Sequence, residues 1–156
     1  MSDRPSEQKS PAILVIHGPN LNMLGLREPE IYGSTGLAEI DAGLKAFGEK
    51  LGLRVSAFQA NSEGAIIDAI QSARSSIAGL IINPAGYTHT SVAIRDALLL
   101  LEVPIIEVHL SNIHKRENFR HRSITAGAAT GQVMGLGPQG YSLALQAIAG
   151  LISAVR

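Results

Sequence analysis

The chain has 156 residues, a length that fits one domain, and 46% of them are hydrophobic, which suffices for a sizeable core. Its 13 basic and 13 acidic residues balance, so the composition indicates no nucleic-acid or anionic-membrane surface. There is no cysteine, which excludes disulfides, thiolate metal sites and cysteine nucleophiles. The first residues are polar and no apolar run approaches the ~20 residues of a membrane span, so we expect a cytoplasmic protein with a flexible tail at residues 1–11.

Apolar runs that favour strands alternate along the chain with segments of helical periodicity. In chain order we expect a strand at 12–16, a long loop at 17–33, a helix at 36–51, a strand at 53–58, a helix capped by Ser62, a strand at 79–82, a helix at 90–101, a strand at 104–108, a single helical turn within 112–122, a strand at 132–136 and a helix at 141–155. This alternation predicts an α/β protein with a five-stranded parallel sheet. It matches the doubly wound flavodoxin-like fold, with strand order 2-1-3-4-5 and one domain at residues 12–156.

The loop HGPNLNMLGLREPEIYG at residues 17–33 is several times longer than most connections in compact domains. Loops of this kind are usually functional lids, binding loops or disordered segments. Its leucine and methionine side chains can anchor part of it to the core. We therefore expect an ordered base followed by a mobile lid.

Polar residues follow three strands that are neighbours in the predicted order. Asn20 comes after the first strand, Asn83 after the third, and Glu107 and His109 end the fourth. In open α/β sheets, ligands bind beyond the carboxyl ends of the strands, where the strand order reverses. The loops at this edge add further groups, several of which bind anions, namely Arg27, Tyr32, His89, Ser111, Arg116 and Arg120. The sequence thus predicts a site for a small polar substrate that bears a carboxylate or a phosphate.

Each residue also has an ordinary structural explanation. His109 alone suits a hydrogen-bonded histidine at a strand end, and Asp96 suits a surface charge beside Arg95. Arg116 and Arg120 are four residues apart and suit one exposed helical face. Glu107 is less ordinary, because a carboxylate inside an apolar strand must be paired or neutral. The functional hypothesis depends on the convergence of these residues at one edge of the sheet.

A glycine motif, Gly135–Gly140, matches GxGxxG between a strand and a helix. It lies on the last strand, and no acidic residue follows Glu117, so the group that holds a ribose in dinucleotide sites is absent. We interpret the glycines as tight strand-to-helix packing. The histidines include no HExxH motif, and His109 and His114 are poorly spaced for one helical face, so no metal is expected.

Three other classes of protein fit the residues of this sequence less well. A flavin- or nucleotide-binding module needs a phosphate-binding loop rich in Ser, Thr and Gly after the first strand, where this chain has GPNLN. A phosphoacceptor domain needs aspartates where this chain has His17 and Asn83. A purely structural assembly protein leaves the pair Glu107 and His109 unexplained.

Three blocks, GPNLNMLGLREPEIYG, INPAGYTHTSVAIRDAL and PIIEVHLSNIHKRENFRHRS, together with the closing GLGPQGY, resemble the type II 3-dehydroquinases (type II 3-dehydroquinate dehydratases) over nearly the whole chain. The resemblance implies a flavodoxin-like enzyme of the shikimate or quinate pathway that needs no metal or cofactor. It implies trimers assembled into a homododecamer, and conversion of 3-dehydroquinate to 3-dehydroshikimate by anti elimination through an enolate. His17 departs from the pattern, because many relatives carry asparagine there, so no direct role is expected for it.

The same resemblance implies a role for each site residue. Tyr32, as tyrosinate, would remove the proton from carbon 2, and Arg27 would favour its ionised form. His109 would protonate the departing hydroxyl on carbon 1, with Glu107 orienting it. Asn20 would help to hold a water at the enolate oxygen, and Asp96 would reach into the site of a neighbouring subunit. Substrate hydroxyls and the carboxylate would be bound by Asn83, His89, Leu110, Ser111 and Arg120.

Overall fold

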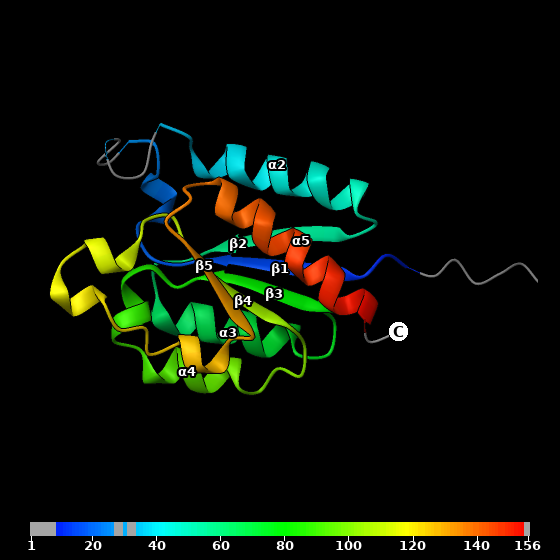
Figure 1. Ribbon diagram of the computed structural model, residues 1–156. Coiled ribbons are helices and arrows are strands. Elements are labelled where there is room, and N and C mark those ends of the chain that lie inside the picture. Colours follow the sequence, from blue (N-terminus) through cyan, green and yellow to red (C-terminus); the bar gives the residue numbers. More distant parts are fainter. Residues whose placement is uncertain (1–8, 27–29, 31–33, 155–156) are drawn as a thin grey trace, which may run out of the picture.

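The computed structural model describes residues 9–26, 30 and 34–154 of the chain. Five parallel strands form one sheet in the order β2-β1-β3-β4-β5 (Figure 1), which confirms the predicted doubly wound topology. The strands are β1 (Ala12–His17), β2 (Arg54–Gln59), β3 (Gly79–Asn83), β4 (Ile105–His109) and β5 (Gly131–Met134). The helices are α2 (Leu37–Lys50), α3 (Glu63–Ala73), α4 (Val92–Leu98) and α5 (Gln139–Ala154). Short 3₁₀ turns are η1 (Leu21–Met23), η2 (Ala85–His89), η3 (Ile113–Lys115), η4 (Asn118–Arg120) and η5 (Ala126–Ala128).

Helices cover both faces of the sheet: α2 and α5 lie over one face, and α3 and α4 lie over the other (Figure 1). Successive side chains of a strand point to opposite faces. Val15 of β1 therefore packs in the cluster beneath α2 and α5, whereas Ile16 packs in the cluster with α3 and α4. Every residue of β3 is buried, because a parallel strand is covered on both sides. None of the described helices is long and apolar enough to cross a membrane.

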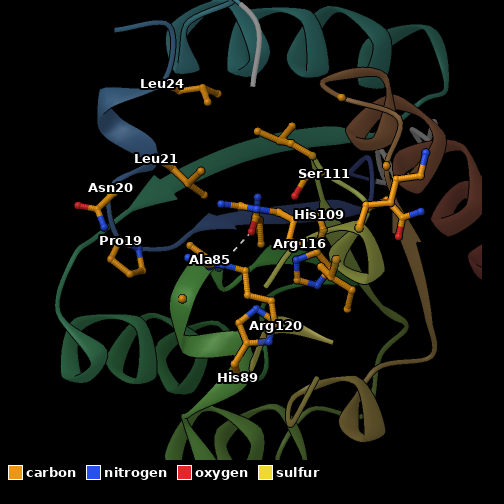
Figure 2. A pocket seen from close by; sticks show the side chains of 18 of the residues that line it. Pro19, Asn20, Leu21, Leu24, Ala85, His89, His109, Ser111, Arg116 and Arg120 are labelled. Atoms are coloured by element: carbon orange, nitrogen blue, oxygen red, sulfur yellow. Dashed lines mark hydrogen bonds between the residues drawn. The ribbon is translucent and has the colours of Figure 1, made fainter. Parts of the chain in front are cut away.

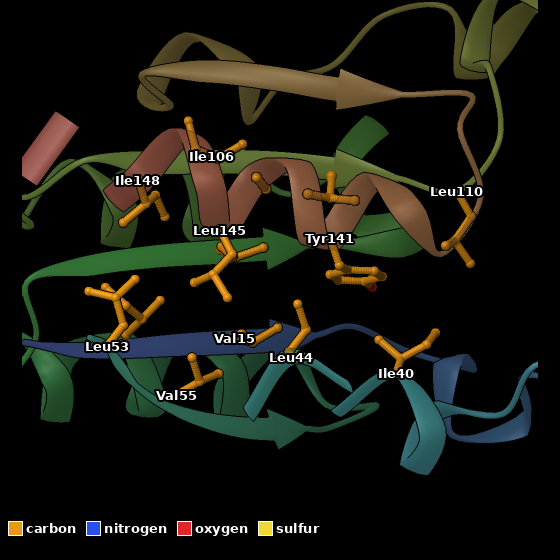
Figure 3. Packing of buried hydrophobic residues seen from close by; sticks show 14 of the residues in the cluster. Val15, Ile40, Leu44, Leu53, Val55, Ile106, Leu110, Tyr141, Leu145 and Ile148 are labelled. Carbon is orange, nitrogen blue, oxygen red and sulfur yellow. The ribbon is translucent and has the colours of Figure 1, made fainter. Parts of the chain in front are cut away.

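The core beneath α2 and α5 is built from branched aliphatic side chains and one aromatic ring (Figure 3). Leu44 of α2 and Leu145 of α5 both belong to this cluster, and Tyr141 points from α5 towards the sheet. Further along α5, Ile148 covers Gly79, where an added Cβ atom would lie 2.8 Å from the Ile148 Cγ2 atom. Close packing of this kind fixes α5 against β3, and it carries the Tyr141 hydroxyl into the interior at the edge where the site lies.

The carboxyl ends of the central strands are level with one another. The register pairs His17 with Asn83 and places Ile82 opposite Glu107. The Gly18 N–H donates to the Asn83 carbonyl oxygen over 2.8 Å. A Cβ atom at Gly18 would lie 2.5 Å from the Pro84 carbonyl oxygen, so only glycine lets the loops after β1 and β3 approach this closely.

Two of the predicted helical segments were wrong in extent. The helix predicted at 90–101 is α4, which begins after Ser91, because the Ser91 side chain accepts from the Ile94 N–H and the preceding residues form η2. The single turn predicted within 112–122 is two 3₁₀ turns, separated by Arg116 in an extended conformation and by Glu117. The predicted cap at Ser62 is confirmed, since its side chain accepts from the Ala65 N–H.

The fifth strand also ends earlier than the predicted 132–136. β5 stops at Met134 because Gly135 has a φ of +83°, a conformation that leaves the extended region and favours glycine. The chain then enters α5 after Pro138. Gly140 packs against Val108 and Val133, as expected for glycines that serve tight strand-to-helix packing.

Candidate active site

A cavity of about 1170 Å³ opens at the carboxyl ends of β1, β3 and β4 (Figure 2). This is the place where the strand order reverses and where ligands bind in open α/β sheets. Most of the residues predicted from sequence line it, namely Asn20, Asn83, His89, His109, Leu110, Ser111, Arg116 and Arg120.

Two of the described residues predicted from sequence do not line this cavity, and two others, with the mobile lid expected after Asn20, cannot be placed in it because they lie outside the described residues. Glu107 lies behind it in β4, fully buried. Asp96 is exposed on α4 and is not part of the lining. Tyr32 and Arg27, the predicted base and its neighbour, lie outside the described residues.

Asn20 is held in a left-handed conformation, with a φ of 69°, which asparagine tolerates better than most residues. Its N–H donates to the Asn61 Oδ1 atom over 3.0 Å. The Gln59 side chain donates to the same oxygen over 3.0 Å and to the Gly18 carbonyl oxygen over 3.2 Å. The Tyr87 hydroxyl donates to the Asn61 carbonyl oxygen over 2.8 Å. The segment after β2 thus fixes the backbone that presents Asn20 to the cavity.

The buried Glu107 carboxylate accepts hydrogen bonds from four side chains. His109 Nε2, Ser123 Oγ and Gln132 Nε2 approach its Oε2 atom at 2.9, 2.8 and 2.6 Å, and the Thr125 hydroxyl donates to its Oε1 atom. Burial raises the pKa of the Glu107 carboxyl, but the hydrogen bonds from His109, Thr125 and Ser123 outweigh it and hold this pKa below its usual value. The carboxylate is therefore ionised although no water reaches it.

This arrangement indicates which nitrogen of His109 faces the cavity. A carboxylate oxygen only accepts, so His109 Nε2 carries a proton towards Glu107. The Nδ1 atom is left for a ligand in the cavity that His109 lines. A proton carried on Nδ1 as well would face the cavity, while Nε2 stays bound to the Glu107 carboxylate. The pair is suited to delivering a proton from Nδ1.

His89 is arranged as an acceptor. Its Nδ1 atom donates to the Arg122 carbonyl oxygen over 2.8 Å, so the unprotonated Nε2 atom is the one available to a ligand. Burial lowers the pKa of His89, and the positive charges of His109 and Arg120 lower it further. A neutral imidazole in this position can accept a hydrogen bond from a substrate hydroxyl.

Two guanidinium groups approach the cavity from the segment after β4. Arg116 follows η3 and Arg120 ends η4, and Glu117 lies between them. The Arg120 Nε atom is 3.1 Å from Glu117 Oε2, and the Arg116 Nε atom is 3.6 Å from Glu117 Oε1. Both arginines are largely covered, with 17% and 28% of the side chain exposed, so they present positive charge to the cavity rather than lining an exposed helical face.

Several supporting residues had no signal in the sequence. Gln132 reaches Glu107 because the register of β4 and β5 places the two residues opposite each other. Ser123 and Thr125 reach it because the loop after η4 folds back under β4. Asn61 follows β2 and therefore stands beside the loop after β1. Only the pairing of distant segments identifies these residues, whereas the strand-end residues followed from the predicted topology.

Acid unfolding should report the ionised Glu107. Its pKa in the folded protein is below the ordinary 4.5, so its contribution to the free energy of unfolding is fully present above pH 4.5 and is lost as the pH falls through the lowered pKa. Urea denaturation of the wild type and Glu107→Gln from about pH 6 to about pH 2.5 checks this. The stability of the wild type should fall more steeply than that of the variant below pH 4.5. Parallel curves would mean that another group is responsible.

Within residues 9–26, 30 and 34–154, no three His, Cys, Asp or Glu side chains gather in a way that could hold a metal ion. The groups at the cavity are a carboxylate-bound imidazole, a neutral imidazole, amides and guanidinium groups. Together they suit binding of a small anionic substrate and proton transfer to it, although the chain as a whole has no net charge. The fold and the site define a flavodoxin-like α/β enzyme of the acid–base type.

The family model described as dehydroquinase class II matches residues 11–149. The 3-dehydroquinate dehydratase 1 of Ralstonia nicotianae is 55% identical over 149 residues, which cover 95% of this chain and 96% of that protein. The catabolic 3-dehydroquinase 1 of Neosartorya fischeri is 55% identical over 138 residues, 88% of this chain and 92% of its own. The crystal structure of the type II dehydroquinase from Propionibacterium acnes matches with a TM-score of 0.88 and 46% identity, over 90% of this chain and 97% of that one. The chain belongs to the class II dehydroquinase family, as the resemblance predicted.

Proposed function

We propose that this chain is a hydro-lyase that converts 3-dehydroquinate to 3-dehydroshikimate, in the shikimate or quinate pathway, by anti elimination through an enolate. The observation that carries the proposal is the Glu107–His109 pair, which ends β4 at a cavity lined by amide and guanidinium groups. The family and relatives named 3-dehydroquinate dehydratase support the substrate and the reaction. Residues 12–156 act as one catalytic domain.

His109 is the acid in this proposal. Hydroxide is a poor leaving group, so the hydroxyl on carbon 1 must receive a proton as its bond to carbon breaks. The Nδ1 atom of His109 supplies it, since Nε2 is held by Glu107. Glu107 positions the ring and stabilises the charged imidazolium before the transfer. The four donors around Glu107 keep that carboxylate fixed and ionised.

Tyr32 is the base, and its role rests on the resemblance of its sequence block to the family. An unperturbed tyrosine has a pKa near ~10 and is a weak base at neutral pH. A guanidinium group close by lowers such a pKa by roughly one to three units, which is the task assigned to Arg27. The tyrosinate removes the proton from carbon 2.

The remaining lining residues bind substrate and the enolate. His89 accepts from a substrate hydroxyl through its Nε2 atom, and Arg120 binds the carboxylate. The Leu110 side chain lies in the core, so this residue contributes backbone groups, together with Ser111 beside it. Asn20 holds a water at the enolate oxygen. Asn83 donates from its side-chain amide.

The proposal is tested by adding 3-dehydroquinate to the purified protein in the presence of a chelator and recording the conjugated enone absorbance of the product. Turnover is expected, with no added metal or cofactor. A protein that is folded yet leaves the absorbance unchanged would contradict the activity. Tight binding of a flavin or a nicotinamide dinucleotide under the same conditions would favour the binding-module alternative.

Arg27→Ala should lower kcat and move the tyrosinate limb of the pH–rate profile to higher pH. The reason is that removing the guanidinium removes the attraction that favours the ionised phenol, so a higher pH is needed to form the base. Rates measured across about pH 6 to about pH 10 with saturating substrate check this. Arg54→Ala removes an exposed charge on β2 and is the matched control. A profile that only drops in height would remove Arg27 from this role.

We also propose that the working form is a homododecamer, a tetramer of trimers, in which each site receives Asp96 from a neighbouring subunit. Asp96 is exposed on α4 and does not line its own cavity, which agrees with a role at another site. Apolar side chains on the same helix, Val92 and the following Leu99, are 58% exposed, as expected for a face that another copy covers. Native mass spectrometry measures the assembly.

Mixed oligomers test the sharing of sites. Asp96→Asn and His109→Gln subunits should each assemble into nearly inactive oligomers. When they exchange subunits, a site that combines the His109 of one subunit with the Asp96 of its neighbour is intact, so part of the activity should return. Asp68→Asn, an exposed aspartate on α3, should be fully active. Mixed oligomers that form but stay inactive would contradict shared sites.

A further inference from the structure

His17 is the last residue of β1 and is fully buried, yet both of its ring nitrogens have partners. Its Nε2 atom is 2.8 Å from the Asp41 Oδ1 atom on α2, and its Nδ1 atom is 3.0 Å from the Tyr141 hydroxyl on α5. The same hydroxyl accepts from the Asn83 Nδ2 atom over 3.2 Å. A continuous chain of hydrogen bonds thus runs from α2 through β1 and α5 to Asn83, which lines the cavity.

With a neutral imidazole at His17, the two ends of this series of hydrogen bonds fix the direction of every hydrogen bond within it. At one end the Ala85 N–H donates to Asn83 Oδ1 over 3.0 Å, so the Nδ2 atom must be the one that faces Tyr141. At the other end the Asp41 carboxylate only accepts, so His17 Nε2 carries the proton. The Tyr141 hydroxyl accepts from Asn83, and its own proton therefore goes to His17 Nδ1.

The middle of the chain is held in the state that this direction requires. Tyr141 is 1% exposed, and burial raises the pKa of its phenol, although the Asn83 hydrogen bond acts against this. The hydroxyl therefore keeps its proton and remains a donor. The Tyr141 and His17 rings meet edge to face, with centroids 5.2 Å apart, which restricts both side chains.

We infer that His17 is a positioning residue that acts through Tyr141 on Asn83, with Asp41 selecting the tautomer that the chain needs. The consequence is a fixed orientation of the Asn83 amide at the cavity. With one Nδ2 proton bound to Tyr141 and Oδ1 bound to Ala85, Asn83 presents its second Nδ2 proton to a ligand in a single orientation. A substrate hydroxyl or carbonyl oxygen is the group that this proton fits, and this step rests on the proposed function.

Breaking the hydrogen bonds that link His17 and Tyr141 to Asn83 should weaken substrate binding more than it slows the chemical step. His17→Leu and Tyr141→Phe should each raise the KM for 3-dehydroquinate by about tenfold, the effect of one lost hydrogen bond, with a much smaller change in kcat. The double variant should lose no more than either single variant, because both act through the same contact to Asn83. Losses that multiply in the double variant would show that the two residues act independently and would overturn the inference.

Ile148→Ala is the matched control for stability. Ile148 lies on α5 in the same core cluster as Tyr141, two turns away from the hydrogen-bonded chain. It should lower the melting temperature at least as much as Tyr141→Phe while KM stays at the wild-type value. If Ile148→Ala raises KM as much as the other two variants do, the effect comes from loosened packing and the inference is wrong.

If His17→Leu or Tyr141→Phe fails to fold, Asp41→Asn tests the same inference. Asp41 is partly exposed, so this substitution is tolerated more easily. An amide can donate as well as accept, so the tautomer of His17 is no longer fixed. Nitrogen-15 NMR of the wild type should show a protonated Nε2 and an unprotonated Nδ1 at His17, and Asp41→Asn should show a mixture together with a raised KM. Unchanged ring signals or an unchanged KM in Asp41→Asn would overturn the inference. A wild type that shows the expected ring signals but no turnover would contradict the proposed function instead.

Discussion

Tyr32→Phe is expected to lower kcat by about 10²–10⁴-fold, the range that a positioned general base contributes, while 3-dehydroquinate still binds. Phenylalanine keeps the ring and loses only the hydroxyl that would take the proton from carbon 2. The rate of enone formation measures kcat. Calorimetric titration of the nearly inactive variant measures binding directly, without interference from turnover.

Tyr87→Phe provides the comparison for that result. It removes a hydroxyl that donates to Asn61 and so supports Asn20 indirectly. The loss of one neutral hydrogen bond of this kind is worth about 0.5–1.5 kcal/mol, or about tenfold at most. If Tyr32→Phe costs no more than Tyr87→Phe, Tyr32 is a supporting residue and another group must be the base.

His109→Gln is expected to lower kcat by a similar 10²–10⁴-fold, with a smaller effect on KM. Glutamine can still donate to Glu107, so the buried carboxylate keeps a partner, but an amide cannot deliver a proton to the departing hydroxyl. Glu107→Gln should cost less than His109→Gln, because it leaves the acid in place and removes only the charge that stabilises it. Comparable losses in the two variants would indicate that Glu107 takes part in the proton transfer itself.

Substrate deuterated at carbon 2 separates the two steps. In His109→Gln, loss of the hydroxyl from the enolate becomes slow, so the isotope effect on kcat should be smaller than in the wild type. In Arg27→Ala, removal of the proton becomes slow, so the isotope effect should be equal or larger. A full isotope effect in His109→Gln would mean that His109 assists proton removal, and the assignment of acid and base would then be reversed.

The carboxylate pair shows how far the chemistry of a site can be anticipated. Glu107 stood inside an apolar strand two residues before His109, and a buried carboxylate needs partners, so an interaction between the two could be predicted. The other partners of the Glu107 carboxylate could not be predicted. Gln132 comes from the register of β5, and Thr125 from a loop that folds back beneath β4. Neither feature leaves a local pattern in the sequence.

His17 shows the opposite limit. In the sequence it was a departure from the family pattern for which no direct role was expected. In the structure it bonds to a tyrosine 124 residues away, and through it to a side chain at the cavity. A hydrogen bond over that separation depends on α5 packing across β1 and β3. The sequence shows that His17 and Tyr141 are present, but it does not show that they lie within hydrogen-bond distance.

The order of strands and helices, and the gathering of strand-end residues at one edge, were determined by the sequence itself. Hydrophobic periodicity is local, and parallel strands joined by helices have few allowed arrangements. The end of β5 and the start of α4 depended on local detail at Gly135 and Ser91, whereas the partners of Glu107 and the hydrogen bonds from Asp41 to Asn83 were decided by tertiary structure alone. These features depend on backbone conformation at single residues such as Gly135 and on close packing between distant segments, and neither has a periodic signature.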